Sequence, residues 1–212
     1  MKSNKIIEKD ELNLEKYPKE FQKFLKKEVE IVKELVNSKD KVLDVGCGNG
    51  RAIPEISPLV SKYVGIDIDE DYLSQARVLA KKFKNSRIIK LNVENLSDSF
   101  KENEFDKSFC LFNTISCFKN YKKALKEIYY VTKNKFYFSV CAKGSKKIRQ
   151  EYYDMIGVEV KFDKSETSYS KAWGQVKAFD EDEIKTFCKE IGFKIEKIIL
   201  INEYSYCIIA YK

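Results

Sequence analysis

Short apolar runs recur along the middle of the chain, and longer amphipathic stretches separate most of them. The runs have the length of buried strands and lie at 41–45, 63–67, 87–91, 105–111 and 136–140. The stretches between them favour a helix from about 51 and helices at 70–83 and 121–132, with a connection at 92–104. Strands that alternate with helices in this way predict an α/β fold with a parallel sheet.

Two segments outside this alternation complete the chain. Residues 1–40 are strongly charged, but their apolar residues approximate a helical stripe of Phe21, Phe24, Leu25, Val29, Ile31, Val32 and Leu35. Residues 142–179 are longer than a plain connection and hold a possible strand pair around 158–162 and 170–178. A chain of 212 residues fits one domain. We therefore predict a single domain, 1–212, made of an N-terminal helical segment (1–40), a core (41–141), an insertion (142–179) and a final helix with strands (180–212).

A glycine-rich turn follows the first predicted strand. Gly46, Gly48 and Gly50 alternate with other residues, and glycine allows both positive φ and close approach of a ligand to the backbone. In a Rossmann-like fold this turn carries a nucleoside cofactor. Arg51 stands where the dinucleotide pattern Gly-x-Gly-x-x-Gly needs its last glycine. Asp44 would repel a pyrophosphate but suits the ammonium and sulfonium of S-adenosylmethionine, so a nicotinamide dehydrogenase is disfavoured.

Later segments follow this turn in a consistent order. Asp67 ends the second strand 67 − 44 = 23 residues after Asp44, which suits the acid about 20 residues beyond the loop that binds ribose hydroxyls. Asn92 follows the third strand, and the pair Phe105-Asp106 opens the fourth. Through this series, residues 38–141 resemble the class I S-adenosylmethionine-dependent methyltransferases.

The resemblance implies a role for each of these positions. Asp44 orients the methionine ammonium, and Asp67 holds the ribose. Ile68 and Val93 sandwich the adenine. Asn92, where the family usually has Asp, reads the adenine edge. The full implied cofactor-binding set is Asp44, Gly46, Cys47, Gly48, Asn49, Gly50, Asp67, Ile68, Asn92, Val93, Glu94 and Asn113. Of these, Asn113 is expected nearest to the methyl group.

Family members also shape the acceptor pocket with N-terminal and inserted segments. The candidate pocket walls here are Tyr17, Thr114, Phe118, Tyr152, Tyr153, Tyr169 and Trp173. The family finishes with a helix and an antiparallel pair, for which the chain supplies 180–191, 193–201 and 204–211. The implied fold is a Rossmann-like, doubly wound, seven-stranded sheet. It is mostly parallel with an antiparallel last strand, an N-terminal helical cap and a small insertion before the final helix.

Composition and charge limit the kinds of binding partner that the sequence predicts. The net charge is +7, but only four of the 40 basic residues are arginine, and the lysines are interleaved with acids. This favours a solvated Lys/Glu-rich surface over a nucleic-acid face. The cysteines show no Cys-x-x-Cys pair and the chain has no histidine, so we expect no metal site. No apolar stretch of about 20 residues predicts a membrane span, and Met1–Lys5 opens without a signal-peptide core. We expect a cytoplasmic monomer or homodimer.

These observations predict an S-adenosylmethionine-dependent methyltransferase that acts by in-line displacement, with S-adenosylhomocysteine as its product. None of the residues just beyond the fourth strand, Asn113, Thr114, Ser116, Cys117 and Phe118, is acidic, and the chain lacks the signatures of amino-directed nucleobase and arginine methylases. Both features favour a small-molecule acceptor, and they assign no catalytic base. Two alternatives stay open: an RNA (tRNA) methyltransferase, and a cofactor-binding module without turnover.

Overall fold

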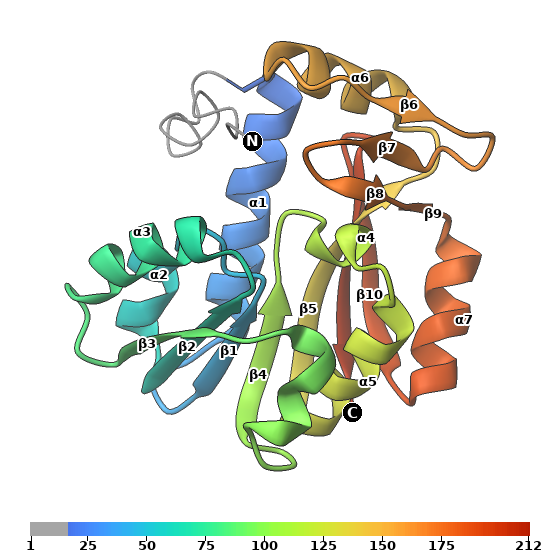
Figure 1. The fold of residues 1–212 in the computed structure, drawn as a ribbon. Helices are drawn as coiled ribbons and strands as arrows, with labels where there is room; N and C mark the ends of the chain where they lie inside the picture. Colours follow the sequence, from blue (N-terminus) through green and yellow to red (C-terminus); the bar gives the residue numbers. More distant parts are fainter. Residues whose placement is uncertain (1–16) are drawn as a thin grey trace.

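The computed structural model describes residues 17–212, which form a central sheet covered by helices on both faces (Figure 1). The sheet comprises β1 (Lys41–Val45), β2 (Lys62–Asp67), β3 (Ser86–Lys90), β4 (Phe105–Cys110), β5 (Thr132–Ala142), β10 (Lys194–Ile201) and β11 (Ser205–Tyr211). Its order is β3-β2-β1-β4-β5-β11-β10. The first five strands are parallel, and β11 is antiparallel to both of its neighbours. The predicted sheet, mostly parallel with an antiparallel last strand, is confirmed.

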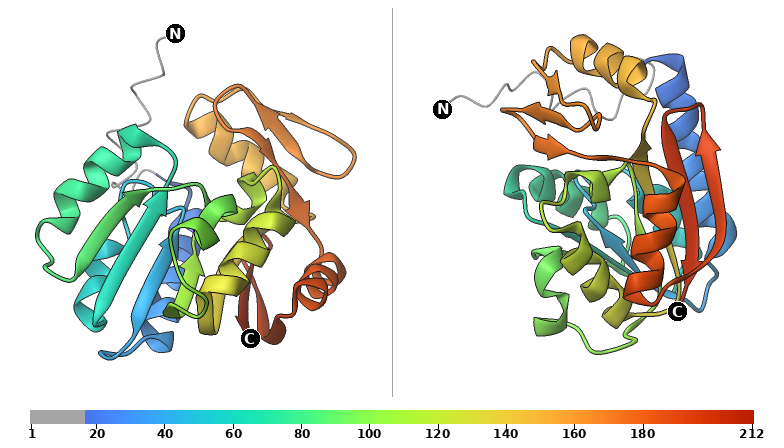
Figure 2. Two further views of the ribbon diagram at one scale, coloured as in Figure 1. Left: turned by 60° about the horizontal axis from the view of Figure 1, so that its bottom comes forward. Right: turned by 90° about the vertical axis from the view of Figure 1, so that its right-hand side faces the viewer.

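Each face of the sheet has its own apolar core. On one face lie α1 (Lys19–Leu35), α2 (Ile53–Ile56) and α3 (Glu70–Ala80); the other is covered by η3 (Val93–Asp98), α5 (Tyr121–Val131) and α7 (Glu181–Ile191). The right-hand view of Figure 2 places α1 and α7 on opposite sides of the C-terminal strands. The strand order reverses between β1 and β4, and ligands bind at such a switch point, beyond the carboxyl ends of the strands.

Local chemistry explains several helix boundaries. The Asp69 side chain accepts hydrogen bonds from the backbone N–H groups of Asp71 and Tyr72 and so starts α3. A reciprocal pair of bonds between Asp180 and Glu183 starts α7. That helix ends at Gly192, whose φ of 111° is a left-handed conformation. These positions agree with the predicted final helix.

The helix expected from about 51 is much shorter than the other two helices predicted between the strands, at 70–83 and 121–132. It is a single turn, α2, followed by the 3-10 turn η2 (Ser57–Leu59). Pro54 and Pro58 each stand near the start of one of these turns, and neither has a backbone N–H to continue the helix before it. The connection at 92–104 likewise contains 3-10 turns, in η3.

The segment between β5 and α7 forms a compact unit above the carboxyl edge of the sheet (Figure 1). It contains α6 (Lys146–Met155) and an antiparallel sheet of β6 (Lys161–Phe162), β7 (Ser168–Ser170) and β8 (Gly174–Val176). We call residues 146–176 the cap. The expected strand pair is thus three short strands, and β9 (Ala178–Phe179) pairs with the end of β5. The connection from β4 to α5 holds one more turn, α4 (Thr114–Cys117).

Helix α1 bears out the helical stripe expected in the N-terminal segment. Its buried residues include Phe21, Phe24, Leu25, Ile31 and Val32. Pro18 is the residue immediately before the helix, where its fixed φ and missing N–H are tolerated. The first 16 residues of the predicted 1–40 segment lie outside the described residues.

Candidate active site

The glycine turn is held against the end of β2. The backbone N–H groups of Gly46 and Cys47 both donate to the Ile66 carbonyl, each at 2.9 Å. Gly46 has a φ of 71°, and a Cβ there would lie 2.5 Å from the Thr114 Cγ2. Gly48 has a φ of 51°, and a Cβ there would meet nothing within 4 Å. The turn is therefore closely packed against α4 but open at Gly48, where a ligand can approach the backbone.

Gly50 has a different part in the turn. A Cβ at this position, where φ is 85°, would lie 2.7 Å from the Ile53 Cδ1 and 3.0 Å from the Ala76 Cα. Gly50 does not line the cavity described below. The structure thus places it at the contact between α2 and α3, where it sets how closely these helices approach the turn.

Asp67 connects the turn to the next strand. One carboxylate oxygen accepts from the Gly48 N–H at 2.9 Å; the other accepts from the N–H groups of Ile68 at 2.7 Å and Asp69 at 3.0 Å. The Ile68 side chain is 64% exposed although it is large and apolar. Both residues line the cavity. An acid beside an uncovered apolar surface suits a ribose joined to an adenine ring.

Asp44 is a buried carboxyl, 2% exposed, at the end of β1. It accepts a hydrogen bond from the Tyr63 hydroxyl and forms no ion pair within residues 17–212. Burial raises its pKa to about 7, although the Tyr63 bond and the Arg51 charge oppose the shift. A ligand ammonium would supply the cation that this carboxyl lacks.

These sites open into one cavity of about 580 Å³. Its core side is lined by Asp44, Gly46, Cys47, Gly48, Asn49, Asp67, Ile68, Asn92, Val93, Glu94 and Asn113, and so by every predicted cofactor residue except Gly50. The Asn92 Oδ1 accepts from the Glu94 N–H at 3.0 Å and so starts η3. The acids and the exposed apolar side chain of this lining are thus suited to the ammonium, ribose and adenine of S-adenosylmethionine.

Asn113 is another residue of the cavity lining and is 3% exposed. It has a φ of 56°, in the left-handed region. Its Oδ1 accepts from the Ser205 hydroxyl at 2.5 Å, whereas its Nδ2 has no acceptor within the described residues. An amide with one satisfied and one free end is poised to donate to a ligand.

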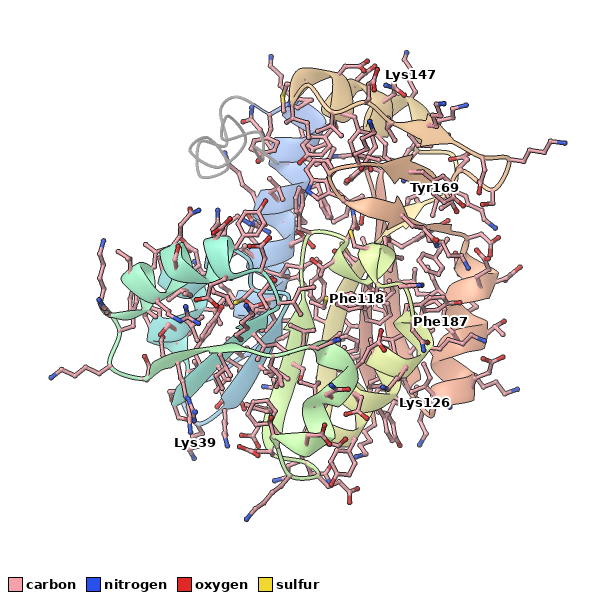
Figure 3. All side chains as sticks on the ribbon, in the orientation of Figure 1. Lys39, Phe118, Lys126, Lys147, Tyr169 and Phe187 are labelled. Carbon is pink, nitrogen blue, oxygen red and sulfur yellow. The ribbon has the colours of Figure 1, made fainter. Side chains whose placement is uncertain are left out.

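Six of the seven predicted pocket residues line the cavity: Tyr17, Thr114, Phe118, Tyr152, Tyr153 and Trp173. Tyr152, Tyr153 and Trp173 belong to the cap, whereas Thr114 lies against the glycine turn. Tyr152 stacks between Tyr17 and Trp173, with ring centroids 5.9 and 6.2 Å away. Figure 3 shows Phe118 on the core side, below the hairpin that carries Tyr169.

Tyr169 is the exception, and its placement corrects the expectation that it forms a pocket wall. Its side chain is 46% exposed, lies outside the cavity lining and donates to Asp163 at 2.9 Å. Successive strand residues point to opposite faces. Since Ser168 of β7 is buried, Tyr169 faces solvent.

Two charged residues that sequence reasoning did not assign to the site lie around the turn. Glu28 of α1 is fully buried and accepts from the Phe112 N–H at 2.8 Å and the Ser139 hydroxyl at 2.5 Å. The Arg51 Nη2 lies 3.6 Å from the Glu28 Oε2. Desolvation raises the Glu28 pKa to about 7 against the opposing charge of Arg51. The position of Glu28 within the helical stripe, between Leu25 and Ile31, is the one signal that predicts its burial.

A third residue outside the predicted set is Arg149 of α6. It is 1% exposed and lines the cavity from the cap side. In the sequence it stands three and four positions before Tyr152 and Tyr153, so all three share one helix face.

Comparison with known proteins identifies the family to which the chain belongs. A sequence profile for a methyltransferase domain matches residues 36–192. The chain belongs to this methyltransferase-domain family. The class I S-adenosylmethionine-dependent methyltransferase recognised from the sequence is thereby confirmed, and so is S-adenosylmethionine as its cofactor.

Solved structures share the whole fold at low identity. A protein of Pyrococcus horikoshii is 22% identical with a TM-score of 0.70, over 95% of this chain and 93% of that one. The 1,6-didemethyltoxoflavin-N1-methyltransferase of Burkholderia thailandensis, solved with 1,6-didemethyltoxoflavin and S-adenosylhomocysteine, is 16% identical with a TM-score of 0.69, over 89% and 77%.

Curated relatives match over shorter regions. An uncharacterised protein of Methanocaldococcus jannaschii is 34% identical over 108 residues, which is 50% of this chain and 38% of that protein. A tRNA (guanine-N(7)-)-methyltransferase of Clostridium botulinum is 32% identical over 93 residues, 38% of this chain and 42% of that protein. The matched region therefore spans less than half the length of these relatives. Within residues 17–212, no helix is both long and apolar enough to cross a membrane.

Proposed function

We propose that this protein transfers the methyl group of S-adenosylmethionine to a small-molecule acceptor held beneath the cap. One observation carries the proposal. A single cavity is lined on its core side by the glycine turn and Asp67, and on its other side by Tyr17, which precedes α1, and by aromatic residues of the cap. An acceptor bound at the aromatic end would therefore face a cofactor bound at the core end.

The chain's own residues act by binding, orientation and exclusion of water. When bound, S-adenosylmethionine supplies an activated methyl group on a sulfonium. Asp44 holds the ammonium, Asp67 holds the ribose, and Ile68 covers the adenine. Asn113 donates its free N–H beside the acceptor. Tyr152 and Trp173 enclose the acceptor, so that it lies in line with the bond that breaks.

Two buried tyrosines line the cavity, Tyr153 of the cap and Tyr204 between β10 and β11, and their protonation limits the chemistry of the acceptor. Burial raises the pKa of both Tyr153 and Tyr204, so these phenols keep their protons at neutral pH. They are suited to donate hydrogen bonds rather than to remove a proton. This supports an acceptor atom that needs no protein base, such as a neutral amine, a thiolate or a carboxylate.

Calorimetric titration with S-adenosylmethionine, S-adenosylhomocysteine and NADH tests the cofactor site directly. We expect micromolar or tighter binding of the first two and none of NADH. A screen of small molecules, with S-adenosylhomocysteine release as the readout, then tests turnover. Binding without release for any acceptor would favour a cofactor-binding module. If neither sulfur compound binds, the proposal is wrong.

A tRNA methyltransferase is the second candidate, and the similarity to the tRNA (guanine-N(7)-)-methyltransferase of Clostridium botulinum supports it. The charge distribution argues against it. Figure 3 labels Lys39 at the lower left, Lys126 at the lower right and Lys147 at the top of the molecule, so these exposed lysines are widely separated and not gathered in one patch. Methyl transfer to tRNA, with binding that weakens steeply as salt rises, would favour this candidate over a small molecule.

A further inference from the structure

Arg149 is a buried cation without a buried anion. Its guanidinium donates to the carbonyl of Glu166 at 2.7 Å, the hydroxyl of Ser168 at 2.7 Å and the carbonyl of Val176 at 3.0 Å. All three acceptors are neutral. Within residues 17–212, no carboxylate lies within ion-pair distance of Arg149. Burying a charge in this way is costly unless an opposite charge compensates it.

The hydrogen bonds of this guanidinium are also incomplete. Arginine offers five N–H donors. Three of its hydrogen bonds go to Glu166, Ser168 and Val176, the Tyr153 hydroxyl is a further neutral partner, and the guanidinium carbon lies 5.1 Å from the centre of the Phe162 ring. The Nε is fully buried and has no acceptor within the described residues. The residue lines the cavity. An anionic group in the cavity would therefore supply the missing charge.

The acids of the cavity lie elsewhere. Those in its lining are Asp44, Asp67, Asp69 and Glu94, which belong to the ends of β1 and β2 and to η3. The lining contributed by α1, α4, the cap and Tyr204 includes no acid within residues 17–212. The cavity thus has an acidic cofactor end and a positively charged cap end, and the positive end attracts an anion.

The other cations of the lining are less suited to this task. Arg51 is paired with Glu28 and lies 3.4 Å from the Leu25 carbonyl. Lys119 is exposed. One uncompensated guanidinium matches a monoanion such as a carboxylate better than a phosphate dianion. Two tyrosine rings lie close to the Trp173 ring in the same cavity lining. The centroid of the Tyr153 ring is 5.8 Å from that of Trp173, and the centroid of the Tyr152 ring, which is nearly parallel to Trp173, is 6.2 Å from it. These rings favour a flat aromatic body.

We infer that the acceptor is a small aromatic carboxylate and that Arg149 binds its carboxylate group. This inference rests on the proposed methyl transfer and names the chemical class of its substrate. The carboxylate is the anchor, and a different atom of the molecule accepts the methyl, because a guanidinium that withdraws charge from an oxygen makes it a poorer nucleophile.

Matched probe pairs test this inference by calorimetry on the protein saturated with S-adenosylhomocysteine. The pairs are benzoate with benzamide, 2-naphthoate with 2-naphthamide, and indole-3-acetate with indole-3-acetamide. Charged hydrogen bonds to buried groups predict that the carboxylate of at least one pair binds about tenfold or more tightly than its amide. If no pair shows this preference, the inference is overturned.

Variants separate anion binding from a role in holding the cap together. Arg149→Met is expected to abolish the carboxylate preference, and Arg149→Lys to keep part of it because the charge remains. Lys147→Met, an equal charge change on the exposed side of α6 (Figure 3), is expected to leave the preference intact. A preference that survives in Arg149→Met would contradict the inference.

The cofactor titration distinguishes the two proposals. Unchanged affinity of the Arg149 variants for S-adenosylhomocysteine shows that the fold and the cofactor end are intact, so that a lost preference reports on the cap end alone. If the unaltered protein does not bind S-adenosylhomocysteine, the proposed function fails and the substrate class with it. If it binds that ligand but shows no carboxylate preference, only the substrate class fails.

Discussion

Replacing Glu28 by Gln is expected to remove a specific pH dependence from the stability of this protein. The carboxyl is fully buried between α1, β5 and Arg51, and its pKa rises from 4.5 to about 7. A carboxyl with a raised pKa in the folded state binds its proton more tightly there than in the unfolded chain. Its contribution to stability is therefore complete below pH 4.5 and is lost as the pH rises through 7.

The size of this effect follows from the two pKa values. At about 1.4 kcal/mol per pH unit, the interval from 4.5 to about 7 corresponds to about 3 kcal/mol. Gln has nearly the same shape, and its carbonyl oxygen can still accept from the Phe112 N–H and the Ser139 hydroxyl. Between pH 4.5 and 8, the free energy of unfolding of Glu28→Gln should therefore rise by about 3 kcal/mol relative to the unaltered protein.

Urea unfolding at a series of pH values, followed by circular dichroism, measures this difference. Asp44 also has a pKa raised to about 7, but it is present in both proteins, so most of its contribution cancels. Glu30→Gln is the matched control, since its side chain lies on the same helix and is 60% exposed. A difference between Glu28→Gln and the unaltered protein that stays constant from pH 4.5 to 8 would refute the reasoning, because Glu28 would then ionise normally in the folded state.

Three further changes test the site and the fold. Asp67→Ala should weaken S-adenosylmethionine binding by about tenfold or more, because it removes the ribose contact and the bond to the Gly48 N–H; an unchanged dissociation constant in calorimetry would contradict that assignment. Gly50→Ala should lower the free energy of unfolding, measured in urea, by about 1–3 kcal/mol, because the added Cβ would clash with Ile53 and Ala76. Gly174→Ala, also at positive φ but facing open space, should cost less, and equal costs would exclude steric contact as the cause. Asp180→Ala should lower the free energy of unfolding by about 1 kcal/mol, because it removes the N-terminal capping hydrogen bond of α7. The change Asp182→Ala at an exposed position on the same turn should leave it unchanged, and thermal unfolding of the two variants compares them.

Much of the fold is readable from the sequence because its signals are local. The strand ends at Val45 and Asp67 follow from apolar runs that stop at polar or glycine residues. The buried positions Ala124, Leu125, Ile128 and Val131 follow from helical spacing. The shortness of α2 also has a local cause, Pro54 and Pro58, which outweighs the apolar pattern around it.

Some residues of the candidate site could be predicted from local sequence signals, and others could not. The ends of parallel strands must meet at one edge of the sheet, so a sequence that orders the strands also gathers Asp44, Asp67 and Asn92 there. Tyr169 depends on strand register instead, and a shift of one residue moves a side chain to the opposite face. No local signal specified which face of β7 would point into the cavity.

The sequence by itself indicated the class of protein, through its resemblance to the methyltransferases. It also indicated the alternation of strands and helices along the chain and the residues predicted for the cofactor end of the site. These depend on periodicity, glycine and short-range spacing, which the chain carries whatever its surroundings. Only the tertiary structure decided that Glu28 is buried against Arg51 and that Arg149 lines the cavity from the cap side without a carboxylate partner among the described residues. The reason is physical: whether a charge is solvated, paired or left waiting for a ligand depends on neighbours that are distant along the chain, and no spacing within one helix records them.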